Sequence, residues 1–218
     1  MKAILAPVWL LSFIFMLPEP ASAQAKPKSK TTIAIPYDSL RNVLENILEK
    51  DQGVRKKLST TPPAERMKVF REMRQIDSAN QVKVKAILAR YGWLPESKLG
   101  EQASDAQFFV IQHADATLME KYLPQLQQLA RTGEAKRTHA AMMEDRILMN
   151  QRKKQVYGTQ GFSNQLTQGK MIIWPIEDHA KVNQRRLEAG FGTTEEEYAK
   201  QLGAAYNPTE VIPGLLAE

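Results

Sequence analysis

The segment from Ala103 to Asp115 constrains the fold more than any other part of the chain. Its four consecutive apolar residues, Phe108 to Ile111, run directly into Gln112, His113 and Asp115. A helix that is apolar on all sides suits a place among other helices, so the segment predicts a central, buried helix. We therefore expect the hydrophobic core to lie beside the polar side chains that carry any chemistry.

Helix caps and helix breakers predict where the neighbouring helices begin and end. Gly53 is expected to bend or end the first helix, and Pro124 to open a new one, because proline inside a helix costs about 3 kcal/mol. Asp115, Asp178 and Thr194 are expected to cap the helices that follow them. Between these signals the apolar residues recur at helical spacing.

Two short β-prone segments interrupt the helical pattern in the last third of the chain. Val156–Thr159 and Met171–Ile176 are separated by a polar loop, which predicts a long-looped hairpin with Pro175 on an edge strand. The sequence therefore predicts a mainly α fold: a single helical domain with a small β-hairpin near the C-terminal third.

The first 23 residues have the composition of a bacterial signal peptide. An apolar run from Val8 to Leu17 ends in Ala21-Ser22-Ala23, which is the small-x-small pattern of a cleavage site. The run is shorter than the roughly 20 apolar residues that span a membrane. We therefore expect cleavage before Gln24, export to the periplasm or medium, and no stable membrane anchor afterwards; a retained anchor is the alternative.

The remaining chain divides by composition. Residues 24–36 are rich in Lys, Pro, Ser and Thr and are expected to form a flexible linker. Residues 37–206 are expected to form the helical domain, and residues 207–218 a tail.

Composition and missing motifs narrow the classes of function. The formal charge of +6 comes from scattered Lys and Arg without a nucleic-acid-binding motif, so no nucleic-acid partner is predicted. The chain has no cysteine, which excludes disulfides and thiol chemistry. No phosphate-binding loop, zinc-protease motif or nucleophile elbow occurs, and three histidines are few for a metal site. No metal or cofactor is predicted.

His113 is the strongest candidate for chemistry. Its imidazole titrates near neutral pH and could transfer protons if Asp145 or Asp77 oriented it, whereas the alternative is a core histidine bonded to a helix end. Asp145-Arg146 and Arg185-Arg186 could form a cluster of carboxylate and guanidinium groups that binds an anion bidentately, or they could form structural ion pairs.

Several polar motifs together resemble a bacterial family of unknown function whose members are often exported. The resemblance covers nearly all of Leu40 to Leu202 and implies one shared pocket, but no activity. It rests on Asp51-Gln52-x-x-Arg55, Asp77-x-x-Asn80, Tyr91-Gly92-Trp93, Gly100, Val110-Ile111-Gln112-His113-Ala114-Asp115, Asp145-Arg146, Gln155-x-Tyr157-Gly158-Thr159-Gln160, Pro175-x-Glu177-Asp178 and Arg185-Arg186.

Two hypotheses follow, and the sequence leaves open whether the protein is an enzyme. The first is a pocket that binds or processes a small molecule, with an anion as one option, in which His113 is the acid or base and Asp145 orients it. Its ligand-binding residues would be Asp77, Asn80, Gln112, Tyr157, Thr159, Gln160 and Arg185. The second is a non-enzymatic envelope protein in which the same groups form a buried polar network. The oligomeric state is not predicted.

Overall fold

The computed structural model describes residues 34–209 and 211–217. The predicted signal peptide (1–23) and most of the predicted linker (24–36) lie outside these residues, so cleavage and export stay predictions. Ile35–Glu218 form one compact unit. Within the described ranges, no helix is both long enough and apolar enough to cross a membrane.

The described residues form helices and one two-stranded antiparallel hairpin, which confirms the predicted fold class. The α-helices are α1 (Tyr37–Thr60), α2 (Arg66–Tyr91), α3 (Glu96–Leu99), α4 (Glu101–Gln112), α5 (Ala116–Arg131), α6 (Arg137–Asn150), α7 (Val182–Ala189) and α8 (Glu195–Leu202). Short 3-10 turns cover Pro63–Glu65 and His179–Lys181, and the strands are β1 (Gly161–Phe162) and β2 (Ile172–Ile173).

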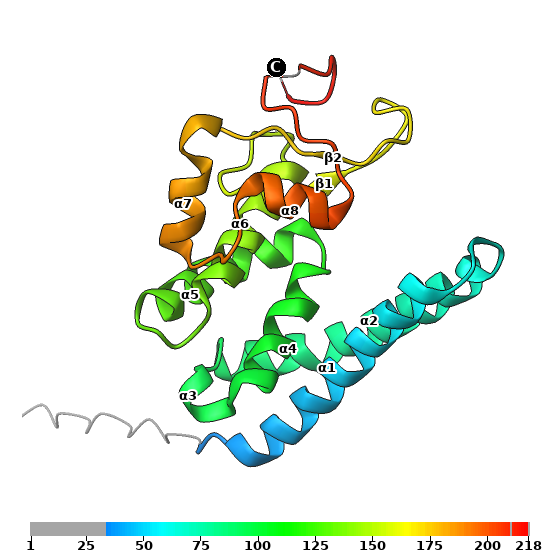
Figure 1. The fold of residues 1–218 in the computed structure, drawn as a ribbon. Helices are drawn as coiled ribbons and strands as arrows, with labels where there is room; N and C mark the ends of the chain where they lie inside the picture. Colours follow the sequence, from blue (N-terminus) through cyan, green and yellow to red (C-terminus); the bar gives the residue numbers. More distant parts are fainter. Residues whose placement is uncertain (1–33, 210, 218) are drawn as a thin grey trace, which may run out of the picture. The chain divides into compact units, whose positions relative to one another are not determined.

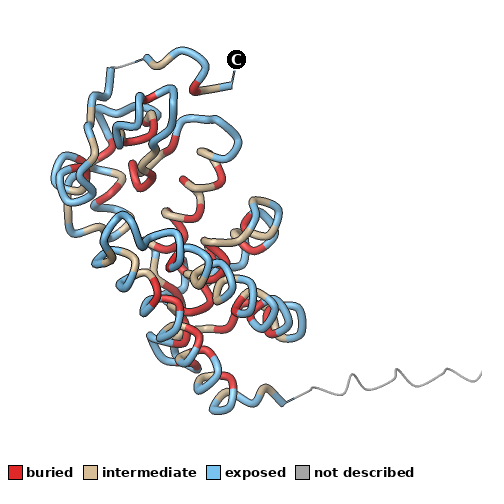
Figure 2. The backbone as a smooth tube through the Cα atoms, turned by 90° about the vertical axis from the view of Figure 1, so that its right-hand side faces the viewer, coloured by how far each residue is buried: buried red, intermediate tan, exposed pale blue. Residues whose placement is uncertain are grey.

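The main core surrounds α4, as the apolar run predicts. Phe108 and Ile111 of α4 are almost fully buried, and they join one apolar cluster with Leu44 of α1, Val84 of α2 and Met143 of α6. Figure 1 shows α1 and α2 as a long antiparallel pair, and α4 packs against both helices. In Figure 2 the buried backbone gathers where these helices face one another.

A second, smaller apolar cluster joins the hairpin to the last helices. It contains Ile173, Ile176, Val182 and Ala199. The hairpin register pairs Gly161 with Ile173. This cluster holds α7 and α8 beside the hairpin and so fixes the C-terminal third of the domain.

Some predicted boundaries are confirmed and others are wrong. Asp115 caps α5 by accepting a hydrogen bond from Leu118 N at 2.9 Å, and Thr194 forms the expected capping box with Glu197. Asp178, in contrast, makes no side-chain cap and has a left-handed backbone with φ of 42°. Its carbonyl oxygen instead accepts a hydrogen bond from Arg185.

Gly53 and Pro124 do not break their helices as predicted. Gly53 lies inside α1 and Pro124 inside α5. Both residues are exposed. The solvent can therefore satisfy the carbonyl that Pro124 leaves unbonded, while burial on the other face of each helix outweighs the local cost.

The predicted first strand, Val156–Thr159, is a loop. Three of its backbone N–H groups donate to the Asp145 side chain, so they cannot pair with a neighbouring strand. The antiparallel ladder begins at Gly161, and before the loop Gln155 forms only an isolated parallel bridge with Ile176. Strand propensity is thus overridden by a buried carboxylate.

Gly158 allows this loop to pack against α8, and its replacement should be costly. A Cβ added at Gly158 would lie 2.1 Å from Glu195 Oε2, and the residue has a φ of +74°. We expect Gly158→Ala to lower the free energy of unfolding by at least about 3 kcal/mol in urea denaturation, because overpacking adds to the left-handed strain. Gly133→Ala is the control: its φ is +77° but no atom lies within 4 Å, so a loss near 1 kcal/mol is expected. Equal losses in the two variants would contradict the packing role.

Candidate functional site

Arg55 is the centre of a polar cluster formed by three helices. From α1 its Nη1 forms an ion pair with Asp51 Oδ1 at 2.9 Å, and its Nη2 donates a hydrogen bond to Asp77 Oδ1 of α2 at 3.0 Å. The same Nη2 lies 2.7 Å from His113 Nδ1, at the end of α4. The Asp51 side chain is only 1% exposed, and its burial raises its pKa, although the neighbouring Arg55 opposes the effect. One guanidinium therefore holds two carboxylates and the imidazole together.

This arrangement fixes the protonation of His113. Because Arg55 can only donate, Nδ1 must accept, and the ring is neutral with its hydrogen on Nε2. Burial, followed by the charges of Arg55 and Arg146, lowers the pKa of His113 to about 4. At neutral pH His113 therefore offers one N–H donor rather than a positive charge.

His113 borders an open cleft of about 440 Å³. Gln112, Arg146 and Asp77 line the same cleft, together with Arg55, Met73, Ala114, Met119 and Asn150. Arg146 comes from α6, and its Nε is buried without a hydrogen-bond partner in the described part of the chain. Gln112 donates to Met142 O at 3.3 Å, but its buried Oε1 accepts no hydrogen bond there either.

Asp145, the residue before Arg146 on α6, does not line the His113 cleft but bonds the loop that follows α6. Its two oxygens accept hydrogen bonds from Val156 N, Tyr157 N and Thr159 N at 2.7–3.2 Å, and from Thr159 Oγ1 at 2.9 Å. The carboxylate is fully buried and fully bonded. The predicted contact in which Asp145 orients His113 is therefore absent, and Arg55 is the group that bonds the imidazole.

Arg185 and Arg186 also bond within the fold. Arg185 donates to three backbone oxygens: Val156 O at 2.9 Å, Glu177 O at 2.6 Å and Asp178 O at 3.1 Å. Arg186 forms an ion pair of 2.8 Å with Glu195 in which both side chains are at most 1% exposed. The Arg185 guanidinium thus ties α7 to the loop and does not reach the His113 cleft.

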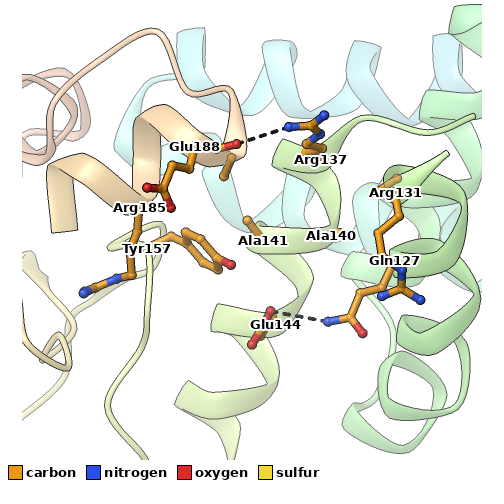
Figure 3. A pocket seen from close by; sticks show the side chains of 11 residues that line it. Gln127, Arg131, Arg137, Ala140, Ala141, Glu144, Tyr157, Arg185 and Glu188 are labelled. Atoms are coloured by element: carbon orange, nitrogen blue, oxygen red, sulfur yellow. Dashed lines mark hydrogen bonds between the residues drawn. The ribbon is translucent and has the colours of Figure 1, made fainter. Parts of the chain in front are cut away.

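A second cleft, of about 570 Å³, lies between α5, α6 and α7 (Figure 3). Four alanines line it, Ala130, Ala140, Ala141 and Ala189, together with Gln127, Arg131, Arg137, Glu144, Tyr157, Arg185 and Glu188. In Figure 3 the Tyr157 ring points toward α6, where Ala141 and Glu144 lie. Two residues predicted for a single pocket, Tyr157 and Arg185, thus border a different cleft from His113.

The predicted site residues therefore divide into three groups. Asp77, Gln112 and His113 share one cleft, Tyr157 and Arg185 border the other, and Asp145, Thr159 and Gln160 form the buried network between them. Asn80 is buried on α2 with its Nδ2 unpartnered within the described residues and lines neither cleft.

Three residues of the His113 cluster were not predicted as site residues: Asp51, Arg55 and Arg146. The resemblance motifs contain all three. For Asp51 and Arg55 only that signal could have found them, because a helix face with Asp and Arg four residues apart is ordinarily a solvated ion pair. Among the described residues, no three His, Asp or Glu side chains are grouped so that they could hold a metal ion.

Comparison with known proteins identifies a family but no function. A family model described as a family of unknown function (DUF6624) matches residues 38–209. No curated protein and no solved structure matches the chain.

Replacement of Asp145 by asparagine tests how far the fold depends on its carboxylate. We expect Asp145→Asn to lower the free energy of unfolding by roughly 2–4 kcal/mol in urea denaturation, because the new amide donor would face backbone N–H donors in a buried site. Asp115→Asn is the matched control: the exposed cap should lose less than about 0.5 kcal/mol, since asparagine caps as well as aspartate. An unchanged stability of Asp145→Asn would contradict the structural role.

Proposed function

We propose a function for this chain on the premise that it belongs to the DUF6624 family, whose function is unknown. The domain binds a small anion that also carries hydroxyl or amine groups, in the cleft bordered by His113 and Arg146. One observation carries the proposal: Arg146 lines this cleft and forms no ion pair with any described residue, while its Nε is buried and has no hydrogen-bond partner among them.

The charges of the cleft support an anionic ligand. Arg55 is neutralised by Asp51 and Asp77, both within 3.0 Å. Burial lowers the pKa of Arg146, which means that its charge is held at a cost. Buried cations in folded proteins are normally paired, and a guanidinium binds carboxylate or phosphate through two parallel hydrogen bonds. An anionic group of the ligand would supply the missing partner of Arg146.

The neutral groups of the cleft support additional hydroxyl or amine groups on the ligand. Gln112 Oε1 is a buried acceptor without a donor, and Asp77 contributes only one oxygen to Arg55. His113 adds one donor, its Nε2–H. A hydroxy acid or a sugar phosphate combines an anionic group with such donors and acceptors.

The same arrangement supports binding by His113 more than acid–base catalysis. A general base works best when its pKa is near the operating pH, whereas the pKa of His113 is about 4. We therefore assign His113 the role of a neutral hydrogen-bond donor to the ligand.

A structural role is supported for the other predicted residues. Within the described residues, Asp145 accepts its hydrogen bonds from the Val156–Thr159 loop, and Arg185 donates its hydrogen bonds to backbone carbonyls. The second hypothesis, a satisfied polar network that fixes packing, therefore suits these two residues, while the ligand site suits the His113 cleft.

We also propose export of the protein, because the first 23 residues have the apolar run and small-x-small site of a signal peptide. N-terminal sequencing of the protein recovered from a periplasmic extract or the medium should find Gln24 as the first residue. Recovery of the protein only from the cytoplasm with Met1 intact would exclude this proposal.

Replacement of Arg146 by methionine should abolish most of the anion affinity while keeping the volume of the side chain. We would titrate the protein with glucose 6-phosphate, malate and inorganic phosphate by isothermal calorimetry. At least one of them should bind the unmodified protein, and Arg146→Met should weaken that binding at least tenfold, or by about 1.4 kcal/mol.

Arg74→Met serves as the control, because Arg74 is an exposed arginine of α2 outside this cleft. It should leave the affinity unchanged. Equal binding by the unmodified protein and Arg146→Met, or no binding of any of the three anions, would count against the proposal.

A further inference from the structure

The cleft between α5, α6 and α7 contains charged side chains of both signs that do not pair with each other. Arg131 and Arg137 border it, as do Glu144 and Glu188, yet none of these four forms an ion pair with a described residue. Arg131 bonds only Gln128, and Arg137 reaches only the Glu188 carbonyl, at 3.5 Å. Opposite charges that line one cleft without meeting are available to a ligand that carries both signs.

Glu144 is the more buried of the two acidic residues that line this cleft. It is half-buried, and within the described part of the chain its only hydrogen-bond partner is Gln127 Nε2, at a long 3.4 Å. Burial, followed by the charge of Asp145, raises the pKa of Glu144. No described Lys or Arg forms an ion pair that would compensate the charge of this carboxylate. The Tyr157 ring comes from the loop and points toward the same part of α6 (Figure 3). A carboxylate beside an aromatic face is a common arrangement for binding an ammonium group.

The opposite end of the cleft suits a carboxylate. Arg131 and Arg137 are both exposed, and their planar guanidinium groups can bind carboxylate oxygens bidentately. Between the two ends, Ala130, Ala140 and Ala141 present methyl groups only. These small side chains leave room for a chain with small apolar substituents but offer it no hydrogen bonds.

We propose that this cleft is a second binding site, which takes a short linear peptide with small side chains and free termini. The peptide ammonium contacts Glu144 and Tyr157, its side chains lie on the alanines, and its carboxylate contacts Arg131 and Arg137. The volume of about 570 Å³ lies within the range of small-molecule sites. The site is separate from the His113 cleft, because Glu144 and Arg146 line different clefts from the same helix.

Trialanine, N-acetyl-trialanine and trialanine amide are the probes that test this site. In a ¹H–¹⁵N NMR titration, trialanine should shift resonances of residues in α5, α6 and α7. Acetylation removes the ammonium and should weaken binding at least tenfold, and amidation removes the carboxylate and should weaken it at least threefold. Absence of shifts, or equal affinity for the three peptides, would overturn the proposal.

Single substitutions test whether the peptide ammonium group binds at Glu144. Glu144→Gln should weaken trialanine binding at least tenfold but leave the weaker binding of N-acetyl-trialanine unchanged, because the acetylated peptide has no charge for Glu144 to bind. An equal loss for both peptides would overturn the assignment.

Glu120→Gln is the matched control, because Glu120 is an exposed acid of α5 outside the cleft, and it should change neither affinity. Arg146→Met should also leave trialanine binding intact, which separates this proposal from the anion site. If Glu144→Gln does not fold, binding of N-acetyl-trialanine and trialanine amide to the unmodified protein still tests the proposal.

Discussion

The buried carboxylate of Asp145 is the interaction on which the rest of the site geometry depends. It accepts hydrogen bonds from three backbone N–H groups and one hydroxyl of the loop that contains Val156 to Thr159. These N–H groups form no hydrogen bonds with a neighbouring strand, and buried N–H groups without partners would be costly. The carboxylate therefore takes the place that a neighbouring strand would fill in a sheet.

Three consecutive residues of α6 distribute the polar chemistry of the domain. Glu144 borders the α5–α7 cleft, Asp145 holds the loop, and Arg146 borders the His113 cleft. Successive residues of a helix point about 100° apart, so three neighbours can serve three different surroundings. The segment after Asn150 is connected to both clefts. Tyr157 borders the cleft between α5, α6 and α7. Gln160 donates to Met142 O, which also accepts a hydrogen bond from Gln112 of the His113 cleft. Any shift of the loop would thus reach both clefts.

The sequence predicted what depends on periodicity and local caps. The buried face of α4, the Asp115 cap and the Thr194 capping box follow from spacing alone, because each depends on residues within one or two turns. It failed for Pro124, where burial on the opposite face outweighs a local penalty. It also failed for the strand at Val156, since the competing partner is a side chain eleven residues earlier, which no local pattern can show.

The pairing of polar residues was the least predictable part, and the reason is physical. The sequence placed Asp145 and His113 in one pocket, but Asp145 is fully buried, His113 is partly exposed, and their hydrogen bonds differ. Asp145 has its bonds within the fold, whereas the His113 cleft leaves Arg146 Nε and Gln112 Oε1 unbonded among the described residues. A satisfied buried group stabilises packing, and an unsatisfied group beside a cleft gains most from a ligand. Saturation of hydrogen bonds, rather than residue type, therefore separates the structural residues of this domain from its candidate binding residues.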